Sequence, residues 1–166
     1  MTKKTIAISA KISATQSQLL RDISQILITA RQSIVQTVNN AMVQAYWHVG
    51  RLIVEYEQKG ESKAEYGAQQ LEYLAEKLQA DFGKGFDERN LRNMRRFYLT
   101  YPIWNAVRTE LNWTHYRVLI RVENQKARDW YAAECIANNW STRALDRQIS
   151  SLYYERLLSS TVKVPI

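Results

Sequence analysis

Arginine is the residue type whose spacing in this chain best supports a specific chemistry. Arg89, Arg92 and Arg96 fall at positions i, i+3 and i+7, so they would share one face of a helix. Arginine forks bind phosphate oxygens, and polyanions release counterions when they meet such a surface. Residues 89–100 contain no acidic residue, which favours a polyanion contact over the alternative of a solvated helix face. The predicted contact residues are Lys84, Arg89, Arg92, Asn93, Arg95 and Arg96.

A second pair of arginines, Arg143 and Arg147, is predicted on the first two turns of another helix. Residues 128–150 have the pattern of a helix, a tight turn at 138–140 and a second, capped helix, as in a helix-turn-helix. Near the start of a recognition helix, an arginine fork matches the O6 and N7 atoms of guanine. The alternative is a plain helical hairpin whose arginines are solvated or paired with Asp146.

Side chains suited to catalysis are few and scattered. His48 and His115 are the only histidines and Cys135 is the only cysteine, so no metal-ligand cluster or nucleophile–base arrangement is indicated. Glu-x-Lys sequences at Glu57 and Glu61 match half of a nuclease motif, but they fall at a helix end and in a loop rather than on a strand. We expect no catalytic residue, no metal and no cofactor in this chain.

Composition indicates a helical protein of the cytoplasm. The 5 Gly and 2 Pro among 166 residues supply too few turns for an all-β fold. A single cysteine suits a reducing compartment, and no segment has the apolar pattern of a signal peptide or a membrane span. The formal net charge is +7, and residues 84–147 hold 12 Lys and Arg against 7 Asp and Glu. Positive charge therefore gathers where both candidate sites lie.

The elements that position these arginines are predicted to be helices. Apolar residues from Leu19 to Val49 recur every three or four positions, which predicts one long helix or a helix pair with a break near Asn39 or Gly50. The fold class is all-α: a multi-helix domain with helix-turn-helix-like units in its second half. The further helices are predicted at residues 63–82, 87–100, 114–123, 126–138 and 141–157.

Three of these helix starts share a design, because an aromatic residue precedes each expected N-cap. The caps are Asp87, Thr114 and Ser141, which are spaced evenly along the sequence and suggest a decayed helical repeat. The organisation expected from the sequence is a flexible leader at 1–15, a helical DNA-binding-like domain at 16–158, and a linker stub or short strand at 159–166.

Five short motifs, in the same order, give the chain a resemblance to the N-terminal domain of the bacterial YhcG family. They lie at residues 30–32 (ARQ), 46–50 (YWHVG), 85–98 (GFDERNLRNMRRFY), 111–116 (LNWTHY) and 139–145 (NWSTRAL). The resemblance implies a helix-turn-helix DNA-binding domain that precedes a nuclease domain of the PD-(D/E)xK type. It implies that residues 159–166 lead toward that nuclease half, so no catalytic residue carries over to this chain.

Two functions of different classes therefore remain open. The first is binding of nucleic acid, expected to be double-stranded DNA, which would target an attached nuclease. The alternative is a protein-interaction or oligomerisation module, in which the stripe from Leu19 to Val49 pairs with a second copy. No membrane partner is expected.

Overall fold

The computed structural model describes residues 2–59 and 64–161, and it describes the side chains of residues 16–58 and 69–160. All regular structure in these residues is helical, which confirms the all-α class. The elements are α1 (Thr2–Lys59), α2 (Ala64–Phe82), η1 (Lys84–Phe86), α3 (Glu88–Thr100), η2 (Trp104–Ala106), α4 (Trp113–Leu119), α5 (Gln125–Ala137), α6 (Thr142–Ser150) and α7 (Tyr153–Thr161). Contacts divide the chain into two units, Met1–Val38 and Asn39–Ile166.

The long N-terminal pattern forms one helix, and the predicted break does not occur. Helix α1 passes through Asn39 and Gly50 without interruption, because both residues keep the backbone N–H that a helix needs and that proline lacks. The helix also includes residues 2–15, the segment expected to be a flexible leader. At the other end, α7 extends through residues 159–161 of the expected linker stub, and residues 162–166 lie outside the described part of the chain.

Gly50 has a packing role rather than a helix-breaking one. A Cβ atom at this position would collide with the backbone carbonyl oxygen of Met94 on α3, and it would lie 3.2 Å from Cβ of Tyr98. Glycine therefore lets the backbones of α1 and α3 approach more closely than any side chain would allow.

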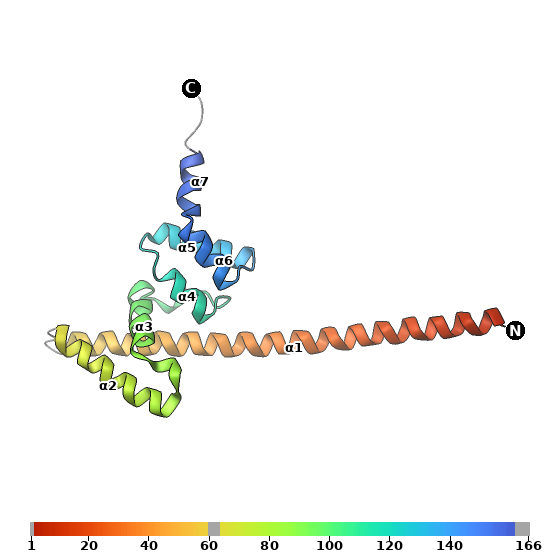
Figure 1. The fold of residues 1–166 in the computed structure, drawn as a ribbon, viewed down its shortest axis with the longest axis horizontal. Helices are drawn as coiled ribbons and strands as arrows, with labels where there is room; N and C mark the ends of the chain where they lie inside the picture. Colours follow the sequence, from red (N-terminus) through yellow and green to blue (C-terminus); the bar gives the residue numbers. More distant parts are fainter. Residues whose placement is uncertain (1, 60–63, 162–166) are drawn as a thin grey trace, which may run out of the picture. The chain divides into compact units, whose positions relative to one another are not determined.

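The core of the second unit consists of two adjoining apolar clusters. One joins α1, α2 and α3 through Ile53, Leu71 and Leu91. The other joins α1 and α3 to the C-terminal helices, with Phe97, Tyr116, Tyr131 and Leu145 among its buried members. Figure 1 shows α3 beside α1 and α2, with α4 between α3 and the α5–α6 pair. Helix α3 thus takes part in both clusters.

Hydrogen bonds fix the chain where α3 ends. The indole Nε1 of Trp47 on α1 donates to the carbonyl oxygen of Tyr101, at 2.7 Å in the interior. The hydroxyl of Tyr116 donates to the carbonyl oxygen of Arg108 and accepts from the Arg108 amide, at 2.7 and 2.6 Å. These bonds satisfy buried backbone groups of a segment that has little secondary structure of its own.

Several helix boundaries differ from the predicted ones. Helix α4 is capped by Asn112 instead of Thr114, because the Asn112 side chain accepts from the His115 amide in a capping box. The expected even spacing of the caps is therefore wrong, although Asp87 and Ser141 do cap α3 and α6. The predicted helix 141–157 is interrupted at Leu152, whose φ of 53° ends α6 and starts α7.

The described side chains of the first unit are almost all exposed. Residues 16–38 form a helix whose large apolar side chains have no cover within the unit: Leu19, Leu20, Ile23, Ile26, Leu27, Ile28, Ile34, Val35 and Val38. Only three residues of this segment are charged, namely Arg21, Asp22 and Arg31. None of the described helices combines the length and apolar character needed to cross a membrane.

The close approach at Gly50 leads to a stability prediction. Gly50→Ala should lower the free energy of unfolding by about 1–3 kcal/mol, because α3 must shift to admit the new methyl group. The helix propensity of alanine acts in the opposite direction, by about 1 kcal/mol. Chemical denaturation checks the effect. Gly85→Ala is the control, since a Cβ there meets no atom within 4 Å; equal effects of the two substitutions would contradict the packing argument.

Candidate nucleic-acid interface

Helix α3 holds the first predicted group of basic residues. Its N-cap is Asp87, whose carboxylate accepts from the amide of Asn90 at 2.7 Å. Leu91, Met94 and Phe97 are fully buried on the inner face. The helical period then places Arg89 and Arg96 on the outer face, where both are exposed. Lys84 lies just before this helix, in η1, and is also exposed.

Two of the predicted α3 arginines have acidic partners, so the expectation of an uncompensated cluster is wrong in part. Arg95 binds the carboxylate of Glu57 on α1 through Nε, at 2.7 and 2.9 Å, and is half-buried. Arg92 pairs with Glu88 one turn earlier. Both acids lie outside residues 89–100, and Glu57 is 38 positions away in sequence. Asn93 is half-exposed on the same helix.

The second predicted group lies in a helix–turn–helix pair made of α5 and α6. Asn124 caps α5, and Ser141 caps α6 through a bond to the Ala144 amide at 3.2 Å. The turn between them contains Asn139, with a φ of 49°, a left-handed conformation that asparagine tolerates well. The predicted turn at 138–140 is therefore present, with the second helix starting where expected.

Arg143 and Arg147 are both exposed on α6, on the side opposite the fully buried Leu145. Neither pairs with Asp146, whose described ion-pair partner is Arg121 at 3.7 Å. The alternative in which Asp146 neutralises these arginines is therefore not what the structure shows. Leu152 is 57% exposed and lies beyond the end of this helix.

His115 links the start of α4 to the α5–α6 turn. Its Nδ1 accepts from the Asn112 amide at 3.4 Å, so Nε2 carries the hydrogen and donates to the Trp140 carbonyl at 3.1 Å. Burial lowers the pKa of this imidazole below its ordinary value, against the effect of the Trp140 bond. Burial raises the pKa of the Cys135 thiol, on the last turn of α5, to about 11. Both side chains thus act as neutral structural groups at neutral pH.

Sequence reasoning missed two arginines with distinct environments. Arg121 reaches Asp146 across 25 positions of sequence, and no local pattern marks this pair. Arg128 is 9% exposed, although it lies in the basic second half that was interpreted as surface. The only sequence feature that could have indicated burial of Arg128 is its place at the fourth position of α5, next to the apolar Ala127.

The structure brings both groups onto helices that flank one element. Helices α3 and α6 each pack against α4. The described contacts do not gather the eight predicted side chains, six around α3 and two on α6, into one cluster. Among the described residues, no group of three or more His, Cys, Asp or Glu side chains is placed to hold a metal ion.

Comparison with known proteins gives two matches. The family model described as the DUF1016 N-terminal domain matches residues 22–156. A protein of Escherichia coli (strain K12), described as "Putative nuclease YhcG", is 32% identical over 186 residues. That alignment covers 93% of this chain and 50% of the relative, so the chain spans about half the relative's length. No solved structure matches the chain.

The buried imidazole predicts a pH dependence of stability. The pKa of His115 is lower in the folded state than the unfolded value of about 6.5, so folding favours the neutral ring. The stabilisation that the neutral His115 ring gives the folded state should be complete above about pH 6.5 and should be lost as the pH falls through the folded-state pKa. Protonated Nδ1 can no longer accept from Asn112.

Melting curves between pH 8 and 5 test this contribution on the intact chain. His115→Gln keeps a capping-box acceptor but cannot titrate, so its loss of melting temperature between these limits should be smaller than that of the wild type. His48→Gln, which removes the exposed histidine, controls for the loss of an imidazole. If the melting temperatures of His115→Gln and wild type fall in parallel with pH, protonation of His115 does not affect stability.

Proposed function

The chain belongs to the DUF1016 N-terminal domain family, and we propose that it binds double-stranded DNA through its helix-turn-helix pair. In this proposal the domain holds DNA for a nuclease domain attached to it, which would correspond to the half of the E. coli relative that this chain does not cover. The support from comparison is the 32% identity to a relative described as a "Putative nuclease", of which this chain covers half the length.

The observation that carries the proposal is a set of exposed basic side chains that form no ion pair among the described side chains. Arg143 and Arg147 on α6 take part in none of the ion pairs found among the described side chains. The same holds for Lys84, Arg89 and Arg96 around α3. Solvent-exposed guanidinium groups with no internal partner are available to phosphates and base edges.

The two groups are suited to different tasks. Arg143 and Arg147 lie one turn apart on α6, near its N-terminus, as expected for side chains that reach base edges from a recognition helix. Arg89 and Arg96 are two turns apart on α3 and suit backbone phosphates, which carry no sequence information. Arg95 is engaged by Glu57 and Arg92 by Glu88, so they are weaker candidates.

A double substitution on α6 tests the DNA-binding proposal. Arg143→Ala with Arg147→Ala should weaken binding to a selected duplex by about 5- to 150-fold for each lost contact, with a smaller loss on scrambled duplex. Fluorescence anisotropy at fixed salt measures both affinities. Stability should change by less than about 0.5 kcal/mol, because both side chains are exposed.

The matched control is Arg21→Ala with Arg31→Ala, which removes the same charge from exposed positions of α1. If the control loses as much affinity as the α6 variant, net charge alone drives binding and the helix-turn-helix assignment fails. Equal losses on selected and scrambled DNA would instead reduce the α6 arginines to phosphate contacts. Unchanged binding by a folded α6 variant would move the proposed readout to α3.

A second function is favoured by the apolar face of the first unit. Ile34 and Val38 are 65% and 55% exposed, and they continue a stripe of similar side chains over residues 19–38. We propose that this stripe pairs with a second copy of the chain. With so few charged residues, the segment suits a like helix better than a charged partner.

Substitution on the stripe tests this assembly. Ile34→Glu or Val38→Glu should shift the chain from dimer to monomer, because a buried carboxylate without a partner costs several kcal/mol. Light scattering coupled to size exclusion measures the mass. Gln32→Glu adds the same charge on the other side of the helix and should leave the dimer intact. A wild type that is monomeric at high micromolar concentration would exclude this interface.

A further inference from the structure

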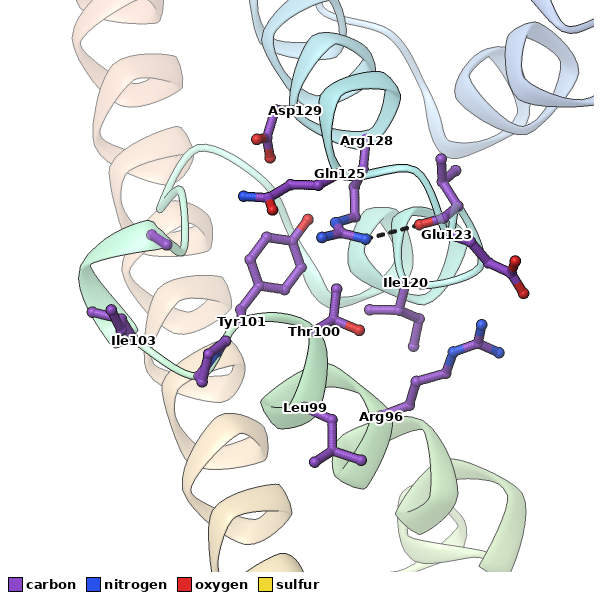
Figure 2. Close-up of a pocket in the computed structure, with 13 residues that line it drawn as sticks. Arg96, Leu99, Thr100, Tyr101, Ile103, Ile120, Glu123, Gln125, Arg128 and Asp129 are labelled. Carbon is purple, nitrogen blue, oxygen red and sulfur yellow. Dashed lines mark hydrogen bonds between the residues drawn. The ribbon is translucent and has the colours of Figure 1, made fainter.

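A pocket of about 680 Å³ opens in the second unit, beside the end of α3 and the start of α5. Its size is that of a small-molecule site. One wall is apolar and includes Leu99, Ile103 and Ile120. The polar lining includes Arg96, Thr100, Glu123, Gln125 and Asp129. It also includes Tyr101 and Arg128, whose side chains are turned toward one another in Figure 2.

Arg128 is a buried charge without a buried counter-charge. It is 9% exposed and takes part in none of the ion pairs among the described side chains. One terminal nitrogen donates to the carbonyl oxygen of Val122 at 2.9 Å, and the guanidinium lies 5.5 Å from the ring centre of Tyr101. Its Nε has no hydrogen-bond partner among the described residues. A cation in this position is costly unless an anion joins it.

Tyr101 supplies a second unused donor at the same place. Its side chain is 7% exposed, and its hydroxyl has no hydrogen-bond partner within the described part of the chain. Burial raises the pKa of Tyr101 to about 12, so the hydroxyl keeps its proton at neutral pH. Tyr101 and Arg128 lie against one another and line the same pocket, and each keeps a buried donor without a hydrogen-bond partner among the described residues, which an acceptor bound in the pocket could satisfy.

The backbone and the remaining charges also bear on the ligand's sign. The N-terminus of α5, capped by Asn124, borders the pocket through Gln125, and the free amides of a helix start favour anions. Two arginines and two acids line the pocket: Arg96 lies on the α3 side, Asp129 lies on the α5 side, and Glu123 precedes α5 and, like Asp129, is exposed. Asp129 is exposed and opposes an anion, which makes it a useful probe of the ligand's charge.

We propose that this pocket binds a small organic oxyanion, in which a phosphate or carboxylate head contacts Arg128 and Tyr101 and an apolar or aromatic body covers the Leu99–Ile103 wall. The fork of Arg128 matches either head group. The pocket shares Arg96 with the proposed phosphate-contacting residues of α3, and it includes no residue of the proposed DNA-reading face of α6.

Three probes on the wild-type chain test the ligand class. Deoxyadenosine monophosphate and benzoate present the two head groups on an aromatic body, and inorganic phosphate presents a head group alone. At least one of the two organic probes should raise the melting temperature and give a saturable calorimetric signal, with affinity at least about fivefold above inorganic phosphate. No binding of either organic probe at about 10 mM overturns the proposal, and equal affinity for inorganic phosphate overturns the role of the apolar wall.

Two tyrosine variants separate binding from folding. Tyr101→Phe removes only the unpaired hydroxyl, so it should keep or raise stability while weakening the organic probe about fivefold or more. Tyr116→Phe breaks the two bonds to Arg108, so it should lower stability and leave the affinity of the folded protein unchanged. Equal effects of both variants on affinity would overturn the site.

A charge variant then tests the sign of the ligand. Asp129→Asn removes one of the two carboxylates that line the pocket, the other being Glu123, so it should strengthen binding of the organic probe by about two- to fivefold at low salt. Lys77→Gln, a remote exposed change, is the control. Weaker binding by Asp129→Asn would show that the ligand's contact group is not an anion.

Discussion

The contact between α1 and α3 is the constraint on which the second unit depends. Without a Cβ at Gly50 the two helix backbones meet at Met94, and the indole of Trp47 binds the Tyr101 carbonyl at the end of α3. These two contacts fix both the position of α3 and the point where the chain leaves it. The segment from α3 to α4, and with it the pocket at Tyr101, follows from that fixed point.

The presence of most helices could be predicted from the sequence, but several of their first and last residues could not. The apolar period and the caps at Asp87 and Ser141 identified α3 and α6, because those signals are local. The break predicted near Gly50 was wrong, because glycine is needed there for the close approach of α3, which lies far along the chain. At α4 the predicted cap, Thr114, was wrong, because Asn112 forms a capping box with His115, which also binds the α5–α6 turn.

The candidate sites show the same division between local and distant information. Spacing alone placed Arg143 and Arg147 on one exposed face of α6, and the structure keeps them there. Spacing could not show that Glu57 binds Arg95, since that pair joins α1 to α3 across 38 positions. Nor could it show that Arg128 is buried, because burial depends on how α5 packs against the segment after α3. A count of basic residues therefore overstates the charge available to a ligand.

The distribution of partners also favours a division of labour in the proposed DNA complex. On α3, two arginines are neutralised by carboxylates, so an approaching phosphate meets fewer free charges than the sequence suggests. On α6, the only acid among residues 142–150 is Asp146, and Arg121 offsets it from outside the helix. The guanidinium groups of Arg143 and Arg147 are therefore not engaged by a carboxylate, and all their donors can serve a ligand. Base-edge readout needs the fork geometry of the guanidinium, whereas phosphate contact needs only charge, so α6 is the better candidate for specificity and α3 for general affinity.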